Sequence, residues 1–379
     1  MRTNYLLLLS ISLFLFGCTT TKSELTLQIE NPGITDRDNE MVEVAWEKIQ
    51  QKLSLAADQT IIITDSEGLQ LPYQLVTNGK EKAETLIFPV SLKAGEKSVY
   101  RLSIGDPAPF QPLVYGRLVP ERKDDFAWEN NRTAFRVYGP ALKATGEISN
   151  GMDFWAKNTE SLIIDKWYKN DLSGVASYHV DHGEGLDFYK VGRTLGLGMT
   201  APLHNDTLCL GDNFVSAEIL DKGPLRFTFK LTYDPYMAGG HEIKETRIIS
   251  LDAYSHFNRV TNIFETDSSH LMLATGIVMA QDQPEITFDD NSGIIAYEIP
   301  GDDTNGIIYT AAIHPDGFDS VGVLNGHYAG MNSYQPGETY TYYTGGGWSK
   351  AGFKSFDDWT AFLKEKKENI NQPFTINID

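Results

Sequence analysis

The residue types that carry acid–base chemistry concentrate in one segment, Ser177–Gly198, which reads SYHVDHGEGLDFYKVGRTLGLG. His179 and His182 stand three positions apart near its start. Three further groups that hold a proton or a charge follow: Tyr189, Lys190 and Arg193. Histidine has a reference pKa of about 6.5 and is therefore a natural general base near neutral pH. We predict the active site in this segment.

These side chains suit a β-elimination on an acidic sugar. That reaction needs a base beside the carboxylate, a cation that stabilises the developing charge, and an acid for the leaving group. We predict a lyase- or dehydratase-type reaction with His179 or His182 as base, Tyr189 as acid and Arg193 as carboxylate clamp. Three further residues are predicted to bind substrate: Glu184, Lys190 and His241, the last in GGHEIKE beside two glycines.

A second charged segment, Gly116–Arg136 (GRLVPERKDDFAWENNRTAFR), mixes arginines with acidic and aromatic residues. The planar fork of Arg122 can clamp a carboxylate, Asp125 can bind sugar hydroxyls, and Trp128 can stack on a sugar ring. The alternative is a solvated loop of mutually neutralising ion pairs, with Trp128 packed in the core. The sequence leaves these two interpretations open.

Other functions use the same residues. A set of nitrogen and oxygen donors could hold a divalent metal: His179, Asp181, His182, Glu184 and Asp187. This spacing matches no well-specified metal motif, so we predict no cofactor. A glycoside hydrolase could use carboxylates from Glu184, Asp187 and Asp125. A mutarotase-like sugar epimerase and a non-catalytic glycan-binding lipoprotein are further alternatives.

The N-terminus predicts export. A basic start and the apolar run Leu6–Phe16 have the proportions of a signal peptide, and this run is too short to span a bilayer. Leu15–Cys18 resembles a lipobox. We predict a signal peptide at 1–17, lipidation of Cys18 and a tether at 18–24. The protein would then lie in the cell envelope, anchored to a membrane in the periplasm or on the outer surface. The alternative is an ordinary signal peptide with an incidental cysteine.

Charge and cysteine content limit the partners. The formal net charge of −19 argues against nucleic acid as a partner. It also requires a local cluster of Arg and Lys to attract an acidic oligosaccharide, which is the predicted substrate. The chain has two cysteines, Cys18 and Cys209. Lipidation of Cys18 would leave Cys209 without a partner for an intramolecular disulfide.

Alternating polar and apolar residues, typical of strands, dominate the rest of the chain. We predict a mainly β protein: a small β-sandwich at 25–106, a proline-rich boundary at Gly105–Pro112, and a large two-sheet, supersandwich-like domain at 113–379. The pattern of Ser161–Lys166 predicts a further strand, and Met41–Leu53 reads as strand or helix. A helix beginning at Ser355 is predicted to end the large domain, because Ser355 and Asp358 form a capping pair.

Three motifs together resemble a known family: PERKDDFAWEN, HVDHGEGLDFYKVGRTLG, and GGGWSKAGFKSFDDW at Gly345–Trp359. The chain resembles the DUF4861 family of Bacteroidota proteins over nearly its whole mature length. Members tend to be encoded among enzymes that degrade acidic, rhamnose-containing polysaccharides. The resemblance therefore implies sugar chemistry, without naming a reaction. The strand pattern is also similar to the supersandwich folds of polysaccharide lyases and mutarotase-like proteins, which is a fold-level analogy.

Overall fold

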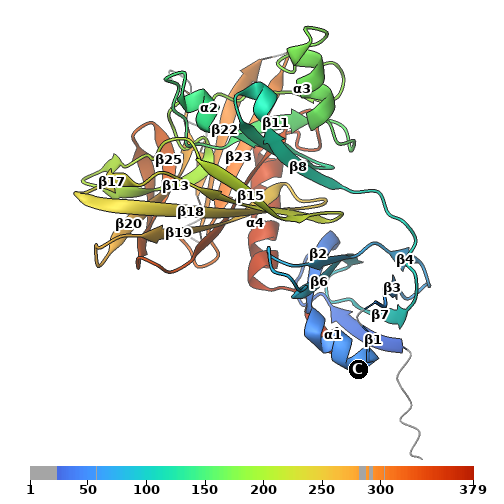
Figure 1. The fold of residues 1–379 in the computed structure, drawn as a ribbon. Helices are drawn as coiled ribbons and strands as arrows, with labels where there is room; N and C mark the ends of the chain where they lie inside the picture. Colours follow the sequence, from blue (N-terminus) through green and yellow to red (C-terminus); the bar gives the residue numbers. More distant parts are fainter. Residues whose placement is uncertain (1–23, 57, 281–286, 290–292, 303) are drawn as a thin grey trace, which may run out of the picture.

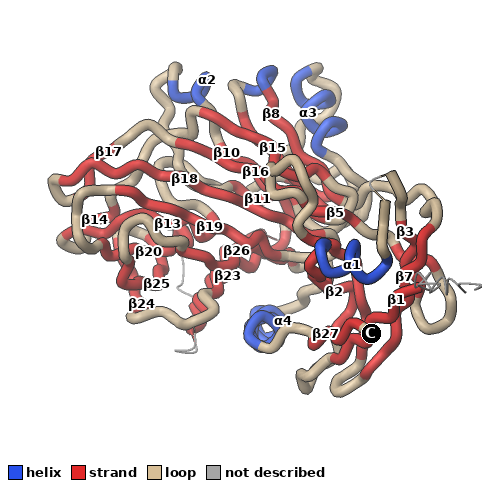
Figure 2. The backbone as a smooth tube through the Cα atoms, turned by 60° about the horizontal axis from the view of Figure 1, so that its bottom comes forward, coloured by secondary structure: helices blue, strands red, loops and turns tan. Residues whose placement is uncertain are grey.

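A computed structural model describes residues 24–379, apart from 57, 281–286, 290–292 and 303. Strands dominate it and few helices are present, so the prediction of a mainly β protein is confirmed (Figures 1 and 2). The predicted signal peptide and the lipidation site Cys18 lie outside the described residues. None of the helices in the described part has the length and apolar character needed to cross a membrane.

The N-terminal part is a sandwich of two antiparallel sheets. The first holds, in spatial order, β27 (Thr375–Ile378), β1 (Glu24–Glu30), β7 (Lys97–Ile104), β3 (Ile61–Thr64) and β4 (Gln70–Leu71). The second holds β2 (Arg37–Ala45), β6 (Thr85–Leu92) and β5 (Gln74–Val76). Their alternating apolar residues form one buried core that also contains Trp46 and Ile49 of α1 (Trp46–Leu53). The ambiguous segment Met41–Leu53 is thus strand first and helix second.

The last strand corrects one expected boundary. We expected all of 113–379 to lie in the large domain. β27 instead pairs with β1, with Leu27 opposite Ile378, so the chain end returns to the N-terminal sandwich. β27 has only four residues, and so short an alternating pattern does not predict from the sequence which sheet the strand joins.

The large domain is built on a nine-stranded antiparallel sheet. Its strands, in spatial order, are β15 (Ser216–Lys222), β16 (Arg226–Thr232), β18 (His241–Asp252), β19 (Phe257–Glu265), β26 (Tyr340–Trp348), β23 (Gly306–Ile313), β22 (Ile294–Asp302) and β21 (Thr287–Asp289), with β17 (Tyr236–Ala238) paired to β18. The helix α4 (Phe356–Asn371) covers one face through Trp359 and Leu363, which pack on Phe257 and Tyr309. The Ser355 hydroxyl accepts the Asp358 N–H at 3.1 Å and caps α4, as predicted.

Two five-stranded sheets cover the other face. The first consists of β14 (Thr207–Leu208), β13 (Leu197–His204), β20 (Leu271–Val278), β25 (His327–Tyr334) and β24 (Ser320–Leu324). The second, here called the site sheet, consists of β12 (Gly185–Leu186), β11 (Asp153–Lys157), β10 (Ala134–Val137), β9 (Asp125–Asn130) and β8 (Val114–Val119). Side chains of all three sheets share the main core, where Phe126 stacks on Phe229 with ring centroids 4.3 Å apart.

Three short helices border the site sheet: η1 (Pro120–Arg122), α2 (Pro140–Lys143) and α3 (Ile164–Leu172). The prediction of a strand at Ser161–Lys166 is wrong, because this segment leads into α3. The buried carboxylate of Glu129 accepts the N–H groups of Ile163 and Ile164 at 2.7–2.9 Å and so caps the start of the helix. Lys157 neutralises Glu129 across the sheet at 2.7 Å.

Candidate functional site

The face of the site sheet that points away from the main core carries buried charge. On β9, Phe126 and Trp128 point into the core, so strand alternation sends Asp125 and Glu129 to the opposite face. Arg136 on β10 joins them there. Charged groups are buried in this way only when they are paired, so the contacts among them define the site.

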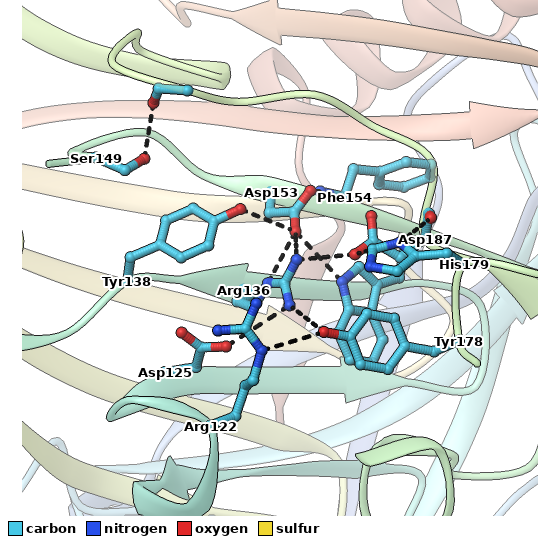
Figure 3. A network of polar contacts seen from close by, with 12 residues as sticks. Arg122, Asp125, Arg136, Tyr138, Ser149, Asp153, Phe154, Tyr178, His179 and Asp187 are labelled. Carbon is cyan, nitrogen blue, oxygen red and sulfur yellow. Dashed lines mark hydrogen bonds and ion pairs between the residues drawn. The ribbon is translucent and has the colours of Figure 1, made fainter. Parts of the chain in front are cut away.

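One guanidinium, that of Arg136, organises the site (Figure 3). It lies 2.6 Å from an oxygen of Asp153, 2.8 Å from Asp187 and 3.6 Å from Asp125. All four side chains are at most 5% exposed. The Tyr138 hydroxyl donates to Asp153 at 3.2 Å. Three carboxylates thus converge on one buried cation.

This arrangement favours protonation of the buried carboxylates. Burial raises the pKa of Asp125 to about 6, although Arg136 and Arg122 oppose the rise. Burial, reinforced by the nearby charge of Asp153, also raises the pKa of Asp187 well above its usual value. In Asp125, Oδ2 accepts from Tyr168 at 3.2 Å, whereas the buried Oδ1 has no partner among the described residues. Burial therefore favours the protonated form of both Asp125 and Asp187.

A lid formed by α3 and the following loop covers the charged face. Trp155 of the sheet stacks on Trp167 and on Tyr178, with centroids 5.6 and 5.1 Å apart. The Tyr178 hydroxyl lies between two guanidinium groups and accepts from Arg136 at 3.2 Å and from Arg122 Nε at 3.4 Å. Arg122, at the half-exposed edge of the network, is thereby linked to the buried charges, as Figure 3 shows.

His179 is the predicted base that the structure connects to this network. Its Nδ1 lies 2.8 Å from the backbone oxygen of Asp187 and 3.6 Å from the Asp187 carboxylate. A carbonyl oxygen only accepts, so Nδ1 carries the hydrogen and Nε2 of the neutral ring is free to take a proton. The side chain is 57% exposed, so solvent reaches it.

His182 has a different environment. It is exposed, and its Nε2 lies 3.1 Å from the Ser177 backbone oxygen within the same loop. Asp181 shapes this loop by accepting the N–H groups of Gly183 and Gly185 at 2.8 and 3.1 Å. Lys350, from the GGGWSK motif, lies 3.8 Å from Asp181. Two of the sequence motifs therefore meet at this loop.

Two predicted roles are corrected. Trp128 is fully buried, and its indole N–H donates to Asn258 at 2.7 Å, so the ring cannot stack on a sugar. Tyr189 lies in the main core with 6% exposure, and burial raises the pKa of its hydroxyl, which has no partner in the described part of the chain, well above the usual value. Its position in the main core excludes the predicted role of acid. Tyr178 is also buried, at 4% exposure, but its hydroxyl lies in the network and contacts Arg136 and Arg122.

The remaining predicted residues lie outside the Arg136 network. Arg193 is 60% exposed, with Asp212 at 4.0 Å, and Lys190 is exposed. Glu184 pairs with Lys166 at 2.7 Å and accepts from the Trp167 indole at 3.3 Å, which ties the loop to α3.

His241 is separate from the predicted active-site segment. It contacts Asp267 at 2.7 Å and lines a small pocket of about 250 Å³ together with His204 and His270. The residues lining that pocket come from β13, β17, β18 and β20 and the loops beside them. His241 therefore lies in a pocket apart from the loop of His179, where it was predicted to bind the same substrate.

Sequence reasoning assigned no role to three central residues: Arg136, Asp153 and Tyr178. Cross-strand pairing brings Arg136 directly opposite Asp153, whereas 17 positions separate them along the chain. The one local signal was the alternation along β9, which places Asp125 and Glu129 on the face opposite Trp128. Among the residues that the structure describes, no three His, Cys, Asp or Glu side chains are arranged to hold a metal ion.

The chain is similar to known proteins in sequence and in fold. Over 385 residues the chain is 29% identical to "Uncharacterized protein P7" of Formosa agariphila, covering 96% of this chain and 95% of that protein. A crystal structure of a glycosyl hydrolase family 38 protein from Enterococcus faecalis has a similar fold, with a TM-score of 0.57 at 9% identity over 95% of this chain. The chain spans about half the length of that structure (48%).

The family assignment rests on a match over most of the sequence. The family described as "Domain of unknown function (DUF4861)" matches residues 29–376. This range includes both charged segments, the lid and the helix α4. The motifs that suggested this family therefore lie inside the matched range, and the chain belongs to the DUF4861 family.

Proposed function

We propose that the protein is a carbohydrate-active lyase that cleaves acidic, uronate-containing oligosaccharides by β-elimination at the Arg136 network. The observation that carries the proposal is the environment of His179. This solvent-accessible imidazole is oriented by a buried Asp187 and lies next to a tyrosine between two arginines. The glycosyl hydrolase similarity concerns the fold and agrees with a sugar substrate.

His179 acts as the base. Its Nδ1–H is held by the Asp187 backbone oxygen, which fixes the ring and leaves Nε2 as the proton acceptor. Nε2 then removes the proton beside the sugar carboxylate. Arg136 in turn fixes Asp187 from the other side. The chain of contacts positions the ring before substrate arrives.

Tyr178 acts as the acid and Arg122 as the clamp. Because two guanidinium groups donate to the Tyr178 oxygen, its own proton is available to a leaving group. Arg122 is the arginine of this network at the half-exposed edge, where a substrate carboxylate can approach. Its positive charge stabilises the enolate that forms when the proton leaves.

Hydrolysis by a carboxylate pair fits the geometry less well. A glycosidase needs two carboxyl groups that flank the sugar bond. Asp125 and Asp187 are at most 2% exposed in their side chains, and Arg136 contacts both. Glu184 is engaged by Lys166. The exposed group with proton-transfer capacity at this network is His179.

The test is the appearance of unsaturated uronate, followed by ultraviolet absorbance on a panel of uronate-containing oligosaccharides. His179→Ala and Tyr178→Phe should each lower turnover by about 10²–10⁴-fold, with a small change in substrate binding. His182→Ala is the matched control, because His182 is an exposed histidine of the same loop outside the network. Equal activity of His179→Ala and His182→Ala would refute the assignment.

A further inference from the structure

A cleft of about 550 Å³ lies between the N-terminal sandwich and the large domain. Its walls come from β2, from the turn between β18 and β19, and from α4, which runs toward the N-terminal sandwich in Figure 1. This volume is within the range typical of small-molecule sites, about 300–1,000 Å³. Its lining includes no residue of the Arg136 network.

A buried acceptor without a partner lines this cleft. The ring of His256 packs edge-on against Phe353 and Phe362, with centroids 5.1 and 5.7 Å apart. Burial lowers its pKa to about 4, so the ring is neutral. Its buried Nδ1 has no hydrogen-bond partner among the residues that the structure describes. Since an unpaired buried polar atom is costly, a hydroxyl donor in the cleft would complete it.

The turn at the rim is fixed in an unusual shape. Tyr254 has a φ of 66°, a left-handed conformation that is uncommon for an aromatic residue. Asn131 Oδ1 accepts the Tyr254 N–H at 2.8 Å, and Asn130 donates to the backbone oxygens of Asp252 and Ser255 at 2.6 and 2.7 Å. These bonds hold an aromatic ring at the cleft in advance of any ligand, as in preorganised binding sites.

The charge of the lining selects against anions. Six carboxylates and four Arg or Lys residues line the cleft. Arg226 is neutralised by Asp252 at 2.5 Å and by Glu43 at 2.7 Å. With these three residues set aside, four carboxylates and three Arg or Lys residues remain, so the lining keeps an excess of one negative charge. Its carboxylates can accept hydrogen bonds from hydroxyl groups, and the excess disfavours acidic groups. A ligand with many hydroxyl groups and no charge fits best.

We propose that this cleft binds an uncharged saccharide unit, which stacks on Tyr254 and donates a hydroxyl to His256 Nδ1. The site is distinct from the Arg136 network and takes sugars of different charge. It would give the protein a second contact with a glycan, independent of any catalysis.

Saturation-transfer NMR on the full chain tests this site, using the methyl glycosides of glucose, galactose, mannose, xylose and rhamnose as probes. At least one neutral glycoside should bind, and methyl glucuronoside should bind more weakly. Tyr254→Asn removes the ring and keeps a residue type that tolerates left-handed backbone. His256→Phe keeps the ring shape and removes the acceptor. Each variant should weaken binding about tenfold, the loss expected for one good contact.

His314→Phe is the matched control. His314 is another histidine whose buried Nδ1 lacks a partner within the described residues. Its ring packs on Tyr340, and it lies outside the cleft lining. The His314→Phe variant should bind neutral glycosides as tightly as the wild type does. The proposal is overturned if no neutral glycoside binds, if methyl glucuronoside binds more tightly, or if Tyr254→Asn binds normally. None of these results depends on turnover, so they leave the lyase proposal unaffected.

Discussion

His179 and Asp187 are in contact through the backbone oxygen and through the carboxylate of Asp187, at 2.8 and 3.6 Å from the imidazole Nδ1. The same carboxylate accepts from Arg136 at 2.8 Å. A solvent-accessible base is thereby connected to a buried guanidinium through one aspartate. Arg136 on β10, Asp187 directly after β12 and His179 in the lid loop must all be in place for this connection to exist.

Replacing Arg122 should separate acidic from neutral ligands. Arg122→Gln removes the cation at the half-exposed edge of the network, so binding of a uronate-containing oligosaccharide should weaken by about 1.5–3 kcal/mol. Neutral sugars should bind as before. Titration calorimetry measures both. Arg193→Gln is the control, because Arg193 is exposed with Asp212 only at 4.0 Å. Equal losses for acidic and neutral ligands would assign Arg122 to structure.

The pH dependence of stability should reveal Asp125. Its folded-state pKa of about 6 lies above its ordinary value of 3.8. Folding therefore disfavours the ionised form, and stability is lost as the pH rises from about 4 through about 6. The loss corresponds to about 3 kcal/mol. Asp125→Asn should remove this dependence, so that urea denaturation shows the variant gaining on the wild type between pH 4 and 7. A constant difference between them over this range would contradict the assignment.

Cys18→Ser should release the protein from the membrane fraction. The prediction rests on the Leu15–Cys18 motif alone, which lies outside the described residues. Lipidation requires the cysteine thiol, and serine leaves the rest of the chain unchanged. Fractionation with immunoblotting measures the distribution. Circular dichroism of the released protein should match that of the wild type. Unchanged membrane association of the variant would refute lipid anchoring at this residue.

The sequence predicted the fold class because alternation is a local property. The apolar alternation of β6 and β23 and the cap of α4 at Ser355 are contained in short stretches of sequence. The prediction of a strand at Ser161–Lys166 was wrong because a distant group, the Glu129 carboxylate, caps the helix that begins in this segment. The position of β27 likewise depends on a partner strand at the opposite end of the chain.

The candidate site could be predicted only in part, because its central contacts join residues that are distant in the sequence. His179, Arg122 and Asp125 were identified by type and by their charged neighbours. The central pair, Arg136 and Asp153, is created by strand register, which no short window of sequence contains. The alternation along β9 places Trp128 in the core and Asp125 on the opposite face, but the sequence alone left both interpretations of Trp128 open. Choosing Tyr178 over Tyr189 required the structure, since both stand near histidines.

The most direct test of the proposed reaction is the product formed from a uronate-containing oligosaccharide in water enriched in heavy oxygen. Elimination breaks the glycosidic bond without adding water. Mass spectrometry should therefore find an unsaturated uronate and no heavy oxygen incorporated by cleavage at the new reducing end, once label gained by slow exchange is subtracted. This product should depend on His179. Rapid incorporation of heavy oxygen with a saturated product would show hydrolysis and would contradict the lyase assignment.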